Sequence, residues 1–397
     1  MKLIKRSEYL NRLIRLQHTS DIKVVTGIRR SGKSILLQQF IEYLKDNDQT
    51  ANIIFINLQD IANDSLLDYH ELHQYVLNKY ETNKYNVLLI DEVQLCKKFE
   101  LAINSLHSKN LFDIYLTGSN AFLLSSDLAT LFTGRVMTIE VFPFSFSEYV
   151  EYSNRNNIDE LFDEYLKYGG MPGVLNYSED IDKNNYLKEV YNTILLRDLV
   201  EKYKIRNVNE LTKTSSYMID NVGRLLSPNN ICKALNNDKS LITRKTISKY
   251  ISYFENSFMF YKVKRYDFNG KKCLISNDKY YLADIGFKYA INSTKNMDYG
   301  CCIENIVFLE LLRRGYEVYI GKLYNKEIDF VAIKNNEKIY IQVSDYIDNP
   351  KTFEREYSSL LSIKDAYPKM IIARTHHDEY FCEGIKIVDI VKWLLNK

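Results

Sequence analysis

Short apolar runs alternate with segments of helical periodicity over the first third of the chain. The apolar runs predict buried strands at Ile22–Thr26, Asn52–Asn57, Val87–Asp91, Asp113–Thr117 and Met137–Val141. Between them, segments such as Lys33–Lys45 and Phe99–Ser108 carry apolar residues at helical spacing. This alternation predicts a parallel sheet covered by helices on both faces, and therefore an α/β domain over residues 1–145.

The pattern becomes helical after Ser145, and the break at Gly169–Gly173 interrupts a predicted connector over residues 146–206. Three helical segments then precede a predicted strand at Lys262–Tyr266. The turn residues Asn269-Gly270 separate this strand from a second apolar run, Cys273–Ile275. Helices followed by a β-hairpin predict a winged helix over residues 207–280.

A further unit is predicted over residues 281–397. A helix from Gly300 precedes three predicted strands, at Glu317–Ile320, Glu327–Ile333 and Lys338–Val343. We therefore expect two α/β domains separated by a helical and winged-helix region.

The composition is that of a folded protein without a membrane segment. Of the 397 residues, 46% are hydrophobic and 26% charged, and the formal net charge is +2. This charge is too near neutral to indicate nucleic acid by itself. No apolar run reaches the roughly 18 residues of a membrane span, and the six cysteines lack paired metal-ligand spacing. We expect a cytoplasmic protein in a reducing environment.

A P-loop pattern, GxxxxGK[ST], follows the first predicted strand. It consists of Gly27, Ile28, Arg29, Arg30, Ser31, Gly32, Lys33 and Ser34. In such a loop the backbone N–H groups and the following helix N-terminus surround phosphate oxygens. Lys33 is predicted to reach the β- and γ-phosphates of ATP, and the Ser34 hydroxyl to ligate Mg²⁺.

Two carboxylates, Asp91 and Glu92, end the strand predicted at Val87–Asp91. Ligands of open α/β sheets bind at the carboxyl ends of strands. Asp91 is therefore predicted to hold the magnesium through water, and Glu92 to polarise the attacking water as a general base. This pair favours hydrolysis over nucleotide sensing alone.

Other candidates for this site are less specific. Thr117 or Asn120 could orient the attacking water, but this segment is equally consistent with a helix cap at Ser119. Arg135 is a candidate for contact with the γ-phosphate, either in the same chain or in a neighbouring subunit. An ordinary surface arginine is the alternative.

Segments spread over nearly the whole chain resemble one known family. They are GIRRSGKS, VLLIDEVQ, LTGSNAFLLS, GRVMTIEVFPFSFSEY, GGMPGVL, LLRDLVEKYKIRN, ENIVFLELLRRGYEVYIG, EIDFVA and YIQVS. They are similar to bacterial and archaeal AAA-type ATPases with a C-terminal domain of unknown function. The resemblance implies nucleotide and magnesium roles for Gly32, Lys33, Ser34, Asp91 and Glu92, and places Arg135 on the Gly-Arg motif of the family.

The last unit resembles the core of PD-(D/E)xK nucleases. Glu304 lies on a predicted helix and Asp329 in a predicted strand. At the next two motif positions this chain has Gln342 in place of the expected glutamate and Ser344 in place of the expected lysine. An amide is a poor substitute for an anionic metal ligand, and a serine supplies no positive charge. We expect the nuclease fold to be retained and cleavage to be lost, unless Asp345 or Lys338 compensates.

Basic residues gather in the predicted winged helix. The candidates for contact with DNA are Arg244, Lys245, Lys249, Lys271 and Lys272. A packing module with a solvated basic face is the alternative.

Three functions are therefore compared. The first is an AAA-type ATPase in which hydrolysis of ATP with Mg²⁺ rearranges C-terminal modules that bind DNA, a protein partner or another copy of the chain. The second is a slow, nucleotide-gated regulatory protein. The third is a metal-dependent nuclease.

Overall fold

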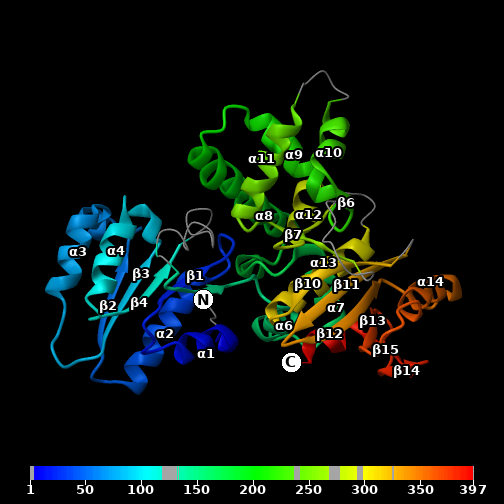
Figure 1. Ribbon diagram of the computed structural model, residues 1–397, viewed down its shortest axis with the longest axis horizontal. Coiled ribbons are helices and arrows are strands. Elements are labelled where there is room, and N and C mark those ends of the chain that lie inside the picture. Colours follow the sequence, from blue (N-terminus) through cyan, green and yellow to red (C-terminus); the bar gives the residue numbers. More distant parts are fainter. Residues whose placement is uncertain are drawn as a thin grey trace. The chain divides into compact units, whose positions relative to one another are not determined.

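The computed structural model describes residues 4–118, 132, 134–236, 242–267, 278–292, 298–323 and 326–396. The chain divides into two compact units, Met1–Pro143 with Asn256–Phe258, and Phe144–Glu255 with Met259–Lys397 (Figure 1). Among the residues described, no helix has the length and apolar character to cross a membrane.

Five parallel strands form the sheet of the first unit, in the order β2-β3-β4-β1-β5. They are β1 (Ile22–Thr26), β2 (Asn52–Asn57), β3 (Asn86–Asp91), β4 (Asp113–Thr117) and β5 (Val136–Glu140). The predicted parallel α/β domain is confirmed. Strands β1, β3 and β4 are buried at every position because both faces of the sheet are covered.

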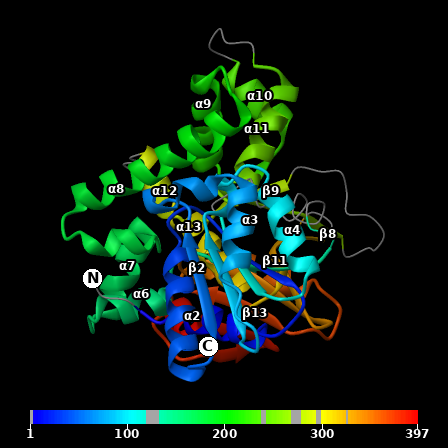
Figure 2. The same ribbon diagram turned by 90° about the vertical axis from the view of Figure 1, so that its left-hand side faces the viewer.

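Helices cover the two faces of this sheet (Figures 1 and 2). They are α1 (Ser7–Arg15), α2 (Lys33–Asn47), α3 (Tyr69–Asn78) and α4 (Phe99–Ser108). On one face, Leu72 of α3 and Ile103 of α4 share a buried cluster with Ile90 of β3. On the other face, the ring centroids of Phe40 of α2 and Tyr115 of β4 lie 4.7 Å apart. Successive residues of a strand therefore point alternately to the face covered by α3 and α4 and to the face covered by α2.

The second unit begins with helices that pack around one another. They are α6 (Phe146–Ser153), α7 (Ile158–Tyr168), α8 (Asp180–Thr193) and α12 (Gly286–Asn292). The glycine-rich segment Gly169–Gly173 follows α7 directly, and its backbone is held by the buried Asp284. The buried Asp284 carboxylate accepts N–H groups from Gly170 at 2.8 Å and Gly286 at 2.9 Å. Burial raises the pKa of Asp284 to about 7, although these N–H groups oppose the shift.

Three helices and a small antiparallel sheet follow. The elements are α9 (Val208–Asp220), β6 (Leu225–Leu226), α10 (Pro228–Leu235), α11 (Arg244–Asn256), β7 (Phe260–Val263) and β9 (Asp278–Leu282), with the sheet order β6-β9-β7. The prediction of one continuous strand at Lys262–Tyr266 was wrong. It divides at Lys264, and β8 (Arg265–Asp267) pairs in parallel with a strand of the C-terminal sheet. The strand paired with β7 is β9, while the predicted Cys273–Ile275 lies outside the described residues.

The C-terminal sheet has seven strands in the order β14-β15-β13-β12-β11-β10-β8. Its elements are α13 (Tyr299–Arg313), β10 (Glu317–Leu323), β11 (Lys326–Lys334), β12 (Glu337–Ser344), α14 (Pro350–Leu361), β13 (Lys369–Ala373), β14 (Tyr380–Cys382), β15 (Ile385–Asp389) and α15 (Ile390–Leu395). Strands β10, β11 and β12 are antiparallel neighbours, whereas β13 joins β12 in parallel. The second α/β fold predicted from the sequence is therefore present.

Candidate nucleotide-binding site

The P-loop connects the carboxyl end of β1 to the first residue of α2. Gly27, Arg30 and Gly32 have positive φ angles of 128°, 67° and 99°. At Gly27 a side chain is excluded, because a Cβ atom would lie 2.2 Å from the carbonyl oxygen of Val141. Ile28 and Ser31 are buried, Arg29 is half-buried and Arg30 is exposed.

The Lys33 side chain is directed into the loop. Its Nζ donates hydrogen bonds to the carbonyl oxygens of Gly27 at 2.9 Å and Ile28 at 3.0 Å. Only 5% of the residue is exposed. The ammonium is therefore held by carbonyl oxygens of the same loop whose N–H groups are predicted to surround phosphate.

Ser34, Asp91 and Thr117 form one hydrogen-bonded group, although they come from three different elements. The hydroxyls of Thr117 and Ser34 both bond to the Asp91 carboxyl. Burial raises the pKa of Asp91, and these two hydrogen bonds oppose that shift. A hydroxyl beside a carboxyl offers the oxygen ligands that Mg²⁺ prefers, so these residues fit the predicted ion.

Glu92 lies at the same edge of the sheet. Its backbone N–H donates to the Thr117 hydroxyl at 3.1 Å, and its carboxylate accepts a hydrogen bond from the Gln94 amide. Glu92 has a φ of 57°, in the left-handed region that non-glycine residues rarely occupy. Backbone strain of this kind also occurs at functional sites.

The strand register places Arg135 far from this group. Ile22, the first residue of β1, pairs with Val136, so Arg135 lies at the amino end of the parallel β5. The P-loop follows the opposite end of β1. Five strand residues span about 17 Å, so Arg135 does not join the P-loop of its own chain. That half of the prediction was wrong. Contact with the nucleotide of a neighbouring subunit stays a prediction, and Asn120 lies outside the described residues.

Arg6 is a residue of this region that sequence reasoning missed. It precedes α1, is only 2% exposed, and donates to the carbonyl oxygens of Ser31 and Phe142, both at 3.0 Å. A basic N-terminal segment gives no signal for such a contact, because its partners lie 25 and 136 residues away.

The nuclease-like residues of the second unit line a cavity of about 810 Å³. The backbone N–H of Asp329 donates to the Gln342 side chain at 2.7 Å, and the Gln342 amide donates to Glu356 at 2.6 Å. Gln342 is thus engaged as a hydrogen-bond link. Ser344 donates to the carbonyl oxygen of Tyr346 at 3.2 Å. In the part of the chain that the structure describes, no three His, Cys, Asp or Glu side chains are placed to hold a metal ion.

Lys279 of β9, a residue that sequence reasoning missed, pairs with two acidic residues that line this cavity. The Nζ of Lys279 lies 2.8 Å from carboxylate oxygens of both Glu304 and Glu327, and the residue is 4% exposed. Two residues could compensate for the missing glutamate and lysine of the nuclease motif. Asp345 lines the cavity, whereas Lys338 donates to the Tyr266 hydroxyl at 2.9 Å. The loss of cleavage stays a prediction.

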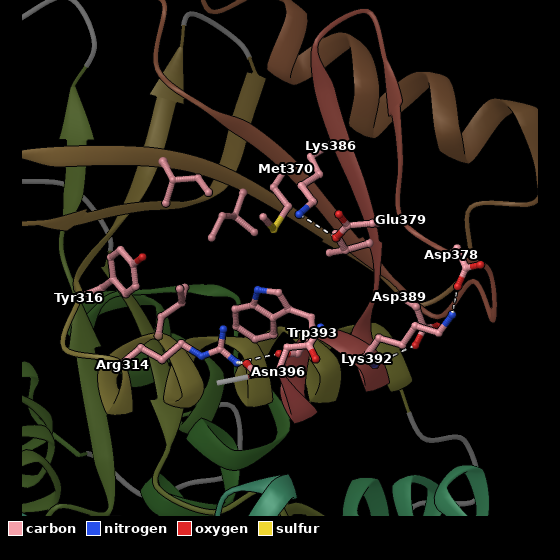
Figure 3. Close-up of a pocket in the computed structure, with 14 residues that line it drawn as sticks. Arg314, Tyr316, Met370, Asp378, Glu379, Lys386, Asp389, Lys392, Trp393 and Asn396 are labelled. Atoms are coloured by element: carbon pink, nitrogen blue, oxygen red, sulfur yellow. Dashed lines mark hydrogen bonds and ion pairs between the residues drawn. The ribbon is translucent and has the colours of Figure 1, made fainter. Parts of the chain in front are cut away.

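A second cavity of the C-terminal domain, of about 530 Å³, lies beside α15 (Figure 3). The Arg314 guanidinium lies 4.2 Å from the Trp393 ring centroid and donates to the carbonyl oxygens of Trp393 and Asn396. Lys386 pairs with Glu379 at 2.7 Å and Lys392 with Asp378 at 2.5 Å. Arg314 thus binds the end of the C-terminal helix, and the charged side chains of this cavity are paired with one another, which indicates a structural function.

Comparison with known proteins agrees with this description. Residues 19–150 match the AAA domain family AAA_14, and residues 159–298 match a domain of unknown function, DUF8612. An uncharacterised protein of Haemophilus influenzae is 37% identical over 399 residues, covering 99% of each chain. Uncharacterised protein MJ1544 of Methanocaldococcus jannaschii is 29% identical over 425 residues, covering 100% of this chain and 93% of the relative.

Two solved structures share weaker similarity. The Aeropyrum pernix ORC1 protein in complex with DNA has a TM-score of 0.35 and 9% identity, covering 74% of this chain and 93% of the other. The AMPPCP-bound DnaA from Aquifex aeolicus has a TM-score of 0.29 and 16% identity, covering 64% and 89%.

The parallel sheet, the P-loop and the AAA domain match define a P-loop ATPase of the AAA class. Within this class, the chain belongs to the family of the Haemophilus influenzae protein. In this chain the AAA domain match is followed by the match to a domain of unknown function.

Proposed function

We propose that this protein binds ATP with Mg²⁺ at the P-loop and hydrolyses it, and that the cycle rearranges its C-terminal modules. The observation that carries the proposal is the convergence of Lys33, Asp91 and Glu92 at one edge of the sheet. In this scheme Lys33 leaves the carbonyl oxygens of the loop for the β- and γ-phosphates. Ser34, and Asp91 through water, would hold the Mg²⁺, which would neutralise charge on the phosphates.

Glu92 acts in this proposal as the general base. Its carboxylate accepts a hydrogen bond from the Gln94 amide, and in this scheme it would accept a proton from the attacking water while Asp91 supports the ion. Arg135, at the far end of β5, is assigned to the nucleotide of a neighbouring subunit.

Replacing Lys33 by alanine is expected to abolish ATP turnover. The variant loses the charge that positions the β- and γ-phosphates, so phosphate release should fall by about 100-fold or more. Phosphate release from Mg-ATP and equilibrium ATP binding measure this effect. Lys45→Ala, an exposed lysine in the last turn of the same helix, is the matched control. Normal turnover in Lys33→Ala would refute the proposed site.

The basic face of α11 favours DNA as one partner of the C-terminal modules. Arg244, Lys245 and Lys249 are exposed, while Ile247 and Phe254 on the other side of the helix are buried. In this interpretation the three helices with the sheet β6-β9-β7 form a winged helix whose third helix contacts phosphates. Lys271 and Lys272, the predicted wing residues, lie outside the described residues.

Joint replacement of Arg244, Lys245 and Lys249 by alanine is expected to weaken DNA binding. The slope of log K against log salt should become less steep by about 0.9 for each phosphate that the variant no longer neutralises. Fluorescence anisotropy at several salt concentrations measures the slope, and phosphate release with and without DNA measures the coupling. The charge-matched control replaces three exposed lysines of the first unit, Lys79, Lys97 and Lys109. Equal binding by both variants would favour a packing module.

A further inference from the structure

Arg6 joins two separate parts of the first unit. Its Nη1 donates to the carbonyl oxygen of Ser31 in the P-loop, and its Nη2 donates to that of Phe142, each at 3.0 Å. A planar guanidinium presents two donors at a fixed separation, which the single ammonium of lysine does not. Arg6 is therefore a bridge between the P-loop and the segment that follows β5.

Other contacts fix the position of this bridge. The backbone N–H of Arg6 donates to the Gln39 side chain of α2 at 3.1 Å, and the Gln39 amide donates to the carbonyl oxygen of Ile4 at 2.6 Å. The Arg6 guanidinium lies 4.6 Å from the ring centroid of Tyr9, whose hydroxyl accepts the N–H of Phe142 at 3.4 Å. A buried guanidinium is costly to desolvate unless its donors are satisfied, so these contacts fix one geometry.

The start of the P-loop touches the same segment. The backbone N–H of Val141 donates to the carbonyl oxygen of Thr26 at 2.9 Å, and its carbonyl lies against Gly27, where no Cβ fits. The P-loop is therefore held against Val141 and Phe142 at two points, at Gly27 directly and at Ser31 through Arg6. Pro143 is the last residue of the first unit before the chain continues into the second.

We propose that Arg6 is a positioning residue that couples nucleotide occupancy of the P-loop to the segment Val141–Pro143. The proposal rests on the proposed ATP site. When Lys33 moves from the carbonyl oxygens of Gly27 and Ile28 to phosphate, the loop backbone reorients around the nucleotide. Arg6 carries the displacement of the Ser31 carbonyl to Phe142, and so to the exit of the chain from the ATP-binding unit.

Hydrogen exchange of the peptide 139–146, with and without Mg-ATP, tests this coupling alongside equilibrium ATP binding. In the wild type we expect ATP to slow exchange in this peptide. Arg6→Ala should bind ATP about tenfold more weakly, because charged hydrogen bonds to the loop are removed. It should also lose the ATP-dependent change at saturating ATP. Arg12→Ala is the matched control, because Arg12 donates to the exposed side of β5, at the carbonyl oxygen of Thr138.

Arg6→Lys keeps the charge but reaches only one of the two carbonyl oxygens. We expect it to fold and bind ATP, and to lack the ATP-dependent exchange change, so it decides the case if Arg6→Ala does not fold. Wild-type exchange changes in Arg6→Lys would overturn the coupling. ATP binding by the wild type without any exchange change would also overturn it, and would leave the proposed ATPase intact. Absence of ATP binding by the wild type would instead refute the ATPase proposal and the coupling together.

Discussion

Glu92→Gln is expected to hold ATP and to stop turning it over. Glutamine has the same shape as glutamate and keeps an oxygen for the hydrogen bond from Gln94, so the left-handed turn at residue 92 should survive. It cannot accept a proton from the attacking water. Loss of a general base lowers the rate by about 100- to 10,000-fold. ATP binding should stay close to wild type, because Lys33, Ser34 and Asp91 are unchanged.

Single-turnover phosphate release with retention of labelled ATP on the protein measures both parts of this prediction. Glu100→Gln, in the first turn of α4, is a control with the same charge change in the same unit. Turnover by Glu92→Gln at the wild-type rate would remove Glu92 from the mechanism. Negligible turnover in the wild type itself, with ATP binding intact, would favour the slow, nucleotide-gated regulatory protein.

Gly169→Ala is expected to lower the free energy of unfolding of the second unit by about 3 kcal/mol or more. Effects of this size arise from substitutions that overpack a buried site or leave buried polar groups unpaired. Gly169 has a φ of 71°, and a Cβ atom there would lie 1.8 Å from a carboxylate oxygen of Asp284. Asp284 is buried and holds N–H groups of both Gly170 and Gly286. The added methyl group must displace this carboxylate, which leaves buried polar groups without their hydrogen bonds.

Chemical denaturation followed by tryptophan fluorescence measures this destabilisation, because the single tryptophan, Trp393, lies in the second unit. Gly384→Ala separates the two causes. Gly384 also has a positive φ, 81°, but a Cβ atom there meets nothing within 4 Å. Backbone strain alone should cost about 1–2 kcal/mol. Equal destabilisation by the two variants would show that Asp284 does not fasten the glycine-rich segment.

The elements that sequence patterns identified are those whose signals are local. Strands β1, β2 and β4 have the bounds that their apolar runs predict. For β1 and β4 the reason is that a strand buried on both faces must be apolar at successive positions. The P-loop was equally visible, since its glycines and Lys33 belong to one motif of eight consecutive residues. The position of Asp91 and Glu92 beside the P-loop followed from the rule that the carboxyl ends of parallel strands lie at one edge of the sheet, where ligands bind.

The division of Lys262–Tyr266 between two sheets was not visible in the same way. Alternating residues suit either sheet, and the choice depends on which edge strand lies within hydrogen-bonding distance. The position of Arg135 was in principle accessible. A residue that directly precedes a parallel strand lies at the amino ends of the strands, opposite to the carboxyl ends where the P-loop begins. The parallel register of β5 with β1 therefore decided where Arg135 lies.

The sequence by itself determined the parallel sheet, the P-loop and the two carboxylates at the same edge of the sheet. Only the tertiary structure decided that Arg6 bridges Ser31 and Phe142, that Lys279 pairs with Glu304, and that Asp284 binds the backbone of the glycine-rich segment. The physical reason is burial of charge. A buried charged group needs partners, but any oxygen acceptor can serve a cation and any N–H donor a carboxylate, and here the partners lie 136, 25 and 114 residues away. Packing of the whole chain, and no local pattern, selects them.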